Sequence, residues 1–237
     1  MLNFLGIGSA FNTALGNTSA FIKKHNSILL FDCGSTVFNR LQKIDLLAEV
    51  SNLYIALTHT HPDHVGSLGE LIFYSHYSLN HKPKIFFPDV NLLNSLLSLM
   101  GVNDSFYEVL PAPEPEITDE FLGSAKLTFV PNSHVDKIPA YGIILMYEGR
   151  TIYYSGDSNK INPSILENFE KGQIDLIYQD TCNLDYEGNP HLFIGKLMDC
   201  IKPSLRSRIY CMHLDRDFRR ELALQSGFNI AEVIAGL

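Results

Sequence analysis

The sequence predicts an α/β protein whose strands fall into two groups, with helices packed outside them. Short apolar or alternating segments, typical of strands, recur along the whole chain, and segments with helical spacing lie between them. No low-complexity linker or internal repeat interrupts this pattern. Because 46 % of the 237 residues are hydrophobic, the chain can bury a large core. We therefore expect a single domain over residues 1–237.

The first half of the chain alternates expected strands with turns and helices. Residues 1–7 alternate loosely and then meet Gly6, Gly8 and Ser9, which predicts a strand that ends in a turn. The other strands expected in this half are residues 20–23, 27–31, 53–57 and 84–87, of which the first two form a hairpin. The expected helices are residues 37–47, 66–78 and 91–100, and the last of them is stopped by Gly101.

The second half is expected to begin with a loop and to continue with strands. Residues 110–119 carry Pro and Glu and are interpreted as a surface loop or lid. The expected strands are residues 126–130, 141–147, 151–155, 176–178 and 207–212, and a tight turn at Glu148-Gly149-Arg150 joins the second and third of these. Residues 163–170 are expected to form a short helix, and further helices are expected between and after the last strands.

Charge and composition exclude several classes of function. The formal net charge of −8 argues against a long nucleic acid as a stable partner, because such binding needs many Lys and Arg side chains. The start of the chain has no pattern of a secretory signal, and no segment approaches the roughly 20 apolar residues of a membrane span. No CxxC pair occurs among the scattered cysteines Cys33, Cys182, Cys200 and Cys211, which we expect to be reduced. These features predict a cytoplasmic protein with no membrane partner.

One short motif dominates the chemistry of the sequence. His59-Thr60-His61-Pro62-Asp63-His64 comes directly after an expected strand and directly before an expected helix. A sharp strand-to-helix connection allows these side chains to converge on one point. Imidazole and carboxylate groups are the ligands that zinc, manganese and iron take, and they are costly to bury unpaired. The motif therefore predicts a metal site.

Three more potential ligands follow expected strands later in the chain. His134 comes after residues 127–130, Asp157 after residues 151–155, and His213 after residues 207–212. Each of these, taken alone, is more often an ordinary loop residue than a ligand. Together with the motif they complete two coordination shells.

The full pattern resembles the metallo-β-lactamase superfamily: HxHxDH, a later His, a Gly-Asp pair and a final His. The resemblance covers nearly the whole chain, from Gly6-Ile7-Gly8-Ser9 to His213. It implies an αββα sandwich with a dinuclear metal site at one edge of the two sheets. The implied first site is His59, His61 and His134; the second is Asp63, His64 and His213; and Asp157 bridges the two ions. Zinc is the expected metal, although manganese or iron would suit the same ligands.

The resemblance also implies a mechanism and a branch of the superfamily. Two cations would share and activate a water, and Asp63 would orient the resulting hydroxide as well as bind a metal. Tyr178-Gln179-Asp180-Thr181 and the later His191 resemble the ribonuclease Z-like phosphodiesterase branch. There an acidic residue orients a His that protonates the leaving oxygen, which gives these roles to Asp180 and His191. The family more often has Glu at the position of Asp180.

Segments near the N-terminus also resemble this branch. They are Gly8-Ser9-Ala10-Phe11, Gly16-Asn17-Thr18-Ser19 and Leu30-Phe31-Asp32-Cys33-Gly34, which we also interpret as turns that support the site. Ribonuclease Z enzymes carry a long arm for tRNA between the Gly-Asp motif and the acidic residue, and this chain has no room for one between Asp157 and Asp180. The arginines near His213 are interpreted mainly as a solvated helix face.

A compact member without an arm is most similar to the anti-Pycsar group, metallo-β-lactamase-fold enzymes that degrade cyclic nucleotide signals. That resemblance implies a metal-dependent phosphodiesterase for 3′,5′-cyclic nucleotides. It also implies a homodimer in which a loop, here within residues 80–119 or 183–189, helps to cover the partner's site. The alternatives are an RNA 3′-end nuclease or a cyclic-phosphate phosphodiesterase, then a lactone or thioester hydrolase, and finally a binding module without catalysis.

Overall fold

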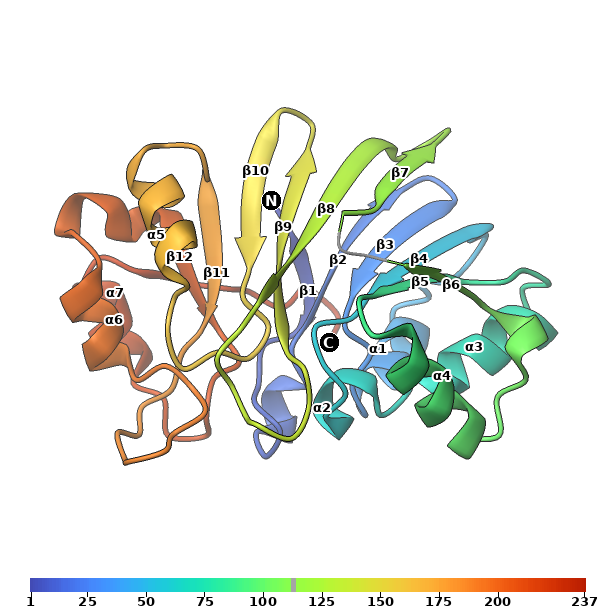
Figure 1. Ribbon diagram of the computed structural model, residues 1–237, viewed down its shortest axis with the longest axis horizontal. Helices are drawn as coiled ribbons and strands as arrows, with labels where there is room; N and C mark the ends of the chain where they lie inside the picture. The colour runs from blue at the N-terminus through green and yellow to red at the C-terminus, as the bar shows by residue number, and fades with distance from the viewer. Residues whose placement is uncertain (112–113) are drawn as a thin grey trace.

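Two β-sheets pack face to face between two outer layers of helices (Figure 1). The computed structural model describes residues 1–111 and 114–237. Helices α1, α3 and α4 lie on the outer side of one sheet, and α5, α6 and α7 lie on the outer side of the other. The predicted αββα arrangement is therefore confirmed.

The first sheet contains the N-terminal strands in sequence order, from β1 to β6. Strands β1 to β3 pair antiparallel, whereas β3 to β6 pair parallel, so the carboxyl ends of β3 and β4 lie at the same edge. The bounds are β1 Asn3–Gly6, β2 Ser19–Lys24, β3 Ser27–Phe31, β4 Asn52–Ala56, β5 Lys84–Phe87 and β6 Glu108–Pro111.

The second sheet has the order β13-β12-β11-β10-β9-β8-β7. Strands β7 to β10 pair antiparallel and β10 to β13 pair parallel, so β8, β10, β11 and β12 all end at the same edge. The bounds are β7 Glu116–Asp119, β8 Gly123–Pro131, β9 Tyr141–Tyr147, β10 Arg150–Tyr154, β11 Leu176–Asp180, β12 Ile209–Met212 and β13 Asn229–Ile230.

The helices are short and amphipathic. Their bounds are α1 Val37–Lys43, α2 Pro62–Val65, α3 Leu68–Tyr77, α4 Val90–Leu99, α5 Pro163–Glu170, α6 Ile194–Cys200 and α7 Arg220–Gln225. The described residues also contain three 3₁₀ turns: η1 Thr13–Leu15, η2 Asp104–Phe106 and η3 Pro203–Arg208. In the described part of the chain, every helix is too short or too polar to cross a membrane.

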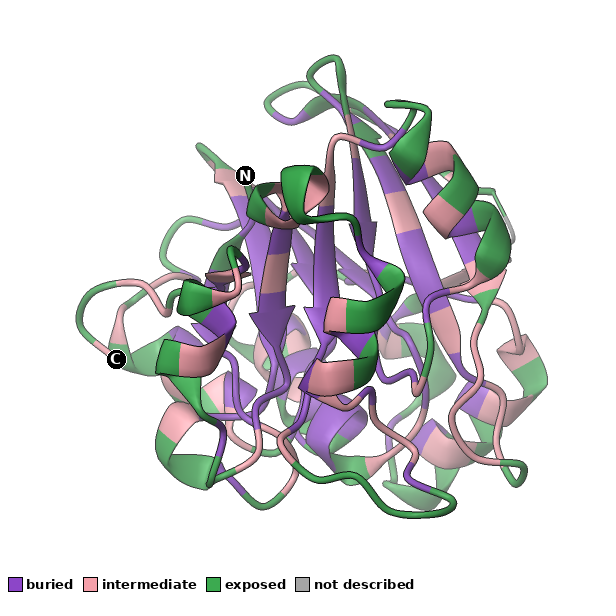
Figure 2. Cartoon of the chain, turned by 90° about the vertical axis from the view of Figure 1, so that its left-hand side faces the viewer, coloured by how far each residue is buried: buried purple, intermediate pink, exposed green. Residues whose placement is uncertain are grey.

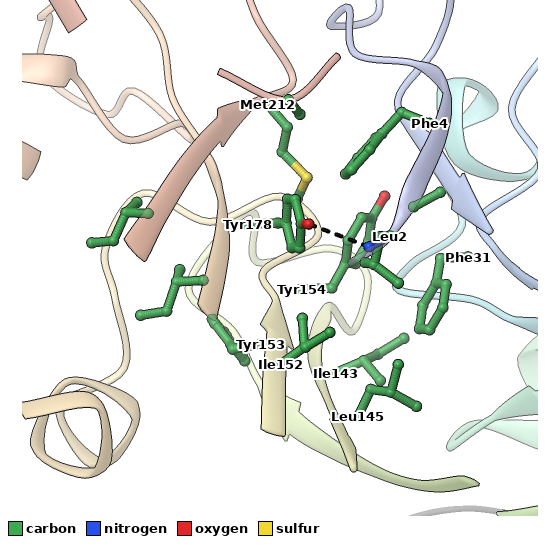
Figure 3. Packing of buried hydrophobic residues seen from close by; sticks show 14 of the residues in the cluster. Leu2, Phe4, Phe31, Ile143, Leu145, Ile152, Tyr153, Tyr154, Tyr178 and Met212 are labelled. Carbon is green, nitrogen blue, oxygen red and sulfur yellow. Dashed lines mark hydrogen bonds between the residues drawn. The ribbon is translucent and has the colours of Figure 1, made fainter. Parts of the chain in front are cut away.

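The space between the sheets is filled by large aromatic and aliphatic side chains. Tyr178 and Tyr154 of the second sheet meet Phe4 and Phe31 of the first, with ring centroids 5.1 Å and 5.5 Å apart (Figure 3). The Tyr178 hydroxyl accepts a hydrogen bond from the backbone N–H of Leu2 over 3.3 Å, which ties the first strand to this layer. Figure 2 shows the strands buried along most of their length, with exposed residues gathered on the outer faces of the helices.

The prediction of a loop over residues 110–119 is wrong in part. β6 and β7 occupy both ends of this stretch, and residues 112–113 between them lie outside the described part. The proline content suggested a loop, but β6 is an edge strand, where a missing N–H need not interrupt a ladder. The helix expected over residues 37–47 is also shorter, because turns replace it after Lys43.

Candidate active site

The candidate ligands lie at one edge of the sandwich because strands of both sheets end there. β4 leads into the His59–His64 motif, and β8, β10 and β12 lead into His134, Asp157 and His213. In Figure 1 this is the lower edge, toward which the arrowhead of β10 points and where α2 lies. All seven predicted ligands are brought together here, in two groups that share Asp157.

The first group contains His59, His61, His134 and Asp157. His61 Nδ1 lies 3.0 Å from His59 Nε2 and 3.2 Å from His134 Nε2, and Asp157 Oδ2 lies 3.6 Å from each of the Nε2 atoms of His59 and His134. Tetrahedral coordination with zinc–nitrogen bonds of about 2.0–2.1 Å places ligand atoms about 3.3 Å apart. The spacing therefore fits a metal ion.

The second group contains Asp63, His64, His213 and the other oxygen of Asp157. His64 Nε2 lies 3.1 Å from Asp157 Oδ1 and 3.5 Å from Asp63 Oδ2, and His213 Nε2 lies 3.3 Å and 3.2 Å from the same two oxygens. His64 Nε2 and Asp157 Oδ1 are buried but have no hydrogen-bond partner among the described residues. Buried polar atoms without partners are costly, and a divalent cation would satisfy both.

Electrostatics favour the protonation states that metal ligands need in the first group. Burial lowers the pKa of His59 well below its ordinary value, so its imidazole is neutral at physiological pH. Burial would raise the pKa of Asp157, but the neighbouring His213 and His64 hold it well below its ordinary value. His213 differs, because Asp157 and Asp180 overcome the effect of burial and raise its pKa to about 10. Metal binding at His213 therefore has to displace a proton.

A fully buried carboxylate, Asp32, orients the second group from behind. It follows β3 and has a left-handed backbone (φ 60°). Asp32 accepts hydrogen bonds from the Thr58 N–H over 2.8 Å and the Thr58 hydroxyl over 2.9 Å, and it lies 2.9 Å from His64 Nδ1. This contact turns His64 Nε2 toward the metal position, as carboxylates behind ligand histidines commonly do.

Sequence reasoning did not find this role of Asp32. The sequence around Asp32 indicates only a turn that supports the site. The available signal was an acidic residue directly after a strand that neighbours the strand leading into the His59–His64 motif.

Asp180 and His191 form a pair beside the two groups. His191 Nδ1 lies 2.7 Å from Asp180 Oδ2, and Asp180 Oδ1 lies 3.4 Å from His213 Nδ1. The aspartate thus reaches His191 although the related family more often has the longer Glu. Burial would lower the pKa of His191, but the Asp180 carboxylate outweighs that effect and raises it. A protonated His191 next to the metal position can donate a proton.

One cavity of about 580 Å³ is lined by the candidate site residues His61, Asp63, His134, Asp157 and His191. Its remaining wall contains Ala10, Phe11, Thr13, Asn17, Val135 and Pro190, among others. Among the described residues that line it, none is Lys or Arg. A bound anion would therefore have to be neutralised by metal ions and His191.

Two of the arginines near the end of the chain, Arg206 and Arg208, have structural roles. Arg206 donates hydrogen bonds to the carbonyls of Ile201, Met198 and Ser226, and Arg208 packs its guanidinium over the Phe169 ring at 4.3 Å. Neither lines the cavity.

Comparison with known proteins places this geometry in a family. The family model described as anti-Pycsar protein Apyc1 matches residues 1–231. The chain belongs to this family. Among its relatives are anti-Pycsar proteins Apyc1 of Paenibacillus harenae, 27 % identical with 90 % of this chain and 88 % of the relative covered, and of Bacillus phage 010DV004, 26 % identical with the same coverage.

Solved structures confirm the metallo-β-lactamase fold. YhfI, a metallo-β-lactamase fold protein from Bacillus subtilis, superposes with a TM-score of 0.75 at 18 % identity, covering 98 % of this chain and 95 % of that one. A diphosphatase of the PhnP family gives a TM-score of 0.75 at 15 % identity, with 98 % and 94 % covered. The short form of human tRNase Z gives 0.65 at 18 % identity, with 98 % and 96 % covered.

The role of Asp32 can be tested through metal affinity. In Asp32→Asn the amide no longer presents a carboxylate to His64, so we expect divalent-metal affinity to fall about 10- to 100-fold. Competition with a chromophoric chelator measures this affinity. Asp119→Asn is the control, because the Asp119 carboxylate accepts hydrogen bonds from the Tyr54 hydroxyl and the Phe121 N–H, away from the site. Unchanged affinity in a folded Asp32→Asn protein would contradict the assigned role.

Proposed function

We propose that this protein is a metal-dependent phosphodiesterase that hydrolyses small phosphodiesters, chiefly 3′,5′-cyclic nucleotides. The observation that carries the proposal is the pair of His/Asp groups sharing Asp157, with His191 beside them in one cavity. Such a site can bind a phosphodiester, direct a water at phosphorus and protonate the oxygen that leaves. Membership of the anti-Pycsar family supports the cyclic nucleotide as substrate.

The site would hold two divalent ions, most suitably zinc. His59, His61 and His134 would hold one, Asp63, His64 and His213 the other, and Asp157 both. When bound, these ions would supply Lewis-acid charge and an activated water, and manganese or iron would suit the same ligands.

The protein's own side chains would position the reacting groups. Asp63 lies on the cavity wall with Oδ2 held 3.2 Å from His213 Nε2, which allows it to orient the attacking water. Asp180 fixes His191 through Nδ1 and leaves the other ring nitrogen to protonate the leaving alkoxide. Alkoxides are poor leaving groups, so this proton transfer would contribute strongly to the rate of hydrolysis.

The wall of the cavity favours a small substrate over a long RNA. A polynucleotide carries further phosphates that need nearby cationic side chains, and the described lining offers none. A cyclic nucleotide carries a single phosphodiester charge. The second candidates are an RNA 3′-end nuclease and a cyclic-phosphate phosphodiesterase, for which the likeness of the fold to tRNase Z and a PhnP-family protein provides a reason to test. In a lactone or thioester hydrolase, His191 would have no clear role as a proton donor.

Replacement of His191 tests the proton donor and the substrate together. We expect His191→Ala to slow hydrolysis of 3′,5′-cyclic nucleotides about 10²- to 10⁴-fold, because the leaving alkoxide loses its acid. Steady-state assays with purified protein and zinc or manganese measure the loss, and a 3′-extended tRNA is assayed in parallel.

His76→Ala is the matched control, since His76 stacks on Phe106 with ring centroids 3.7 Å apart and lies outside the cavity. Cleavage of the tRNA without cleavage of cyclic nucleotides would overturn the substrate assignment. An unaffected His191→Ala rate would overturn the role of His191.

Metal removal tests the requirement for the two groups. We expect a chelator to abolish activity and added Zn²⁺ or Mn²⁺ to restore it, because the ions would carry both the water activation and the phosphate binding. Elemental analysis of the restored protein should give two ions per chain. One ion per chain at full activity would contradict the dinuclear site.

The homodimer is also part of the proposal. In the segment 183–189, Leu184 and Tyr186 are each more than half exposed, and the segment begins next to Asp215, close to His213. Residues 80–119, the other candidate, contain β5, α4, β6 and β7 and so offer less free loop than expected. Size-exclusion chromatography with light scattering should give about twice the 26.7 kDa chain mass. A clean monomer would contradict the dimer.

A further inference from the structure

Phe11 is an exposed aromatic side chain on the wall of the active-site cavity. It is 88 % exposed, and Phe121, at 36 %, is the only other phenylalanine of the described residues that is counted as exposed. An isolated exposed apolar residue needs no explanation, but Phe11 lines the same cavity as His61, Asp63 and His191. Its position beside the candidate catalytic groups makes it a candidate for ligand contact.

The backbone that carries Phe11 is held in place. Ser9 N–H donates to the Leu214 carbonyl over 3.0 Å, and the Asn12 side-chain amide donates to the carbonyls of Leu214 and Asp215 over 3.0 Å and 3.2 Å. Asn12 N–H also closes a tight turn onto the Ser9 carbonyl over 3.0 Å. Because Leu214 directly follows His213, the loop is fixed to the segment that carries a candidate metal ligand.

The cavity has two chemically different parts. One part carries the His/Asp groups that suit a phosphate and its metal ions. The other carries Phe11, Ala10, Val135 and Pro190. At about 580 Å³ it falls within the range of small-molecule sites. A phosphodiester seated at the polar part would direct its organic substituent toward the apolar part, and a flat heteroaromatic ring suits an exposed phenyl ring whose backbone is held in place.

We propose that Phe11 is a specificity residue that stacks on the nucleobase of the substrate. The inference rests on the proposed phosphodiesterase function and adds to it a contact for the base. Because the loop is already ordered, little conformational entropy is lost when the base binds. Stacking is made equally in the bound substrate and in the transition state, so it lowers KM and leaves kcat unchanged.

The experiment compares substrates with and without a base. Wild type, Phe11→Ala, Phe11→Tyr and Phe11→Leu are assayed with 3′,5′-cyclic AMP and with ribose 3′,5′-cyclic phosphate, which lacks the base. For Phe11→Ala we expect KM for cyclic AMP to rise about 5- to 150-fold, the value of one base–aromatic stack, with kcat within about twofold. Tyr should restore the KM and Leu should restore it only in part. KM for the abasic substrate should be the same in all four proteins.

Leu99→Ala is the matched surface control, because Leu99 is also 88 % exposed but lies at the end of α4, outside the cavity. An unchanged KM for cyclic AMP in Phe11→Ala would overturn the inference. An equal rise for both substrates would also overturn it, because the loop would then act on the phosphate end.

Binding separates this inference from the proposed function. Calorimetric titration of metal-loaded protein with cyclic AMP is carried out for wild type and Phe11→Ala. If wild type binds cyclic AMP more tightly than Phe11→Ala but does not hydrolyse it, only the proposed reaction fails. If wild type hydrolyses cyclic AMP and the two proteins bind it equally, only the stacking fails. If wild type neither binds nor hydrolyses cyclic AMP, both fail.

Discussion

The Asp157 carboxylate is buried between five imidazoles, and the architecture of the site depends on it. Its two oxygens lie within 4 Å of nitrogens of His59, His64, His134, His191 and His213. An isolated carboxylate in such a place would be very costly, because burial removes its hydration. The cost is offset only when loops from both sheets bring cationic or metal-binding groups to the same point. Strands that end together at one edge provide this convergence.

Two further buried carboxylates control how the histidines point. Asp32, directly after β3, orients His64 through a contact with its Nδ1. Asp180, at the end of β11, orients His191 and contacts His213. Asp180 therefore connects a candidate metal ligand with the candidate proton donor through a single side chain. Rotation of Asp180 would disturb both, so the position of the proposed metal ligand and the position of the proposed acid are linked. The backbone N–H of Ser158 donates to Asp180 over 3.0 Å and restrains such rotation.

The fold and the clustered side chains could be predicted because they leave strong local patterns. The His59–His64 motif is dense, and His134, Asp157 and His213 each follow a strand that apolar residues mark clearly. The loop expected over residues 110–119 was wrong in part, since proline content does not distinguish a loop from an edge strand whose pairing is one-sided. Asp32 and Phe11 gave no comparable signal. Their significance depends on which distant residues face them, and a single sequence does not record such contacts.

The candidate ligands come from both sheets, so the supply of metal would affect the stability of the whole protein. One ion would join His59, in the segment after β4 of the first sheet, to His134, after β8 of the second sheet, and the other would join His64 of the same segment to His213. Each ion would act as a cross-link that exists only in the folded state. A ligand at about 1,000 times its dissociation constant stabilises the native state by about 4 kcal/mol, a large share of the stability of an ordinary domain. A shortage of the bound metal would then lower the abundance of the protein as well as its activity. Without metal, a larger fraction of the chains would be unfolded and open to proteases, although no residue of the apolar core has changed.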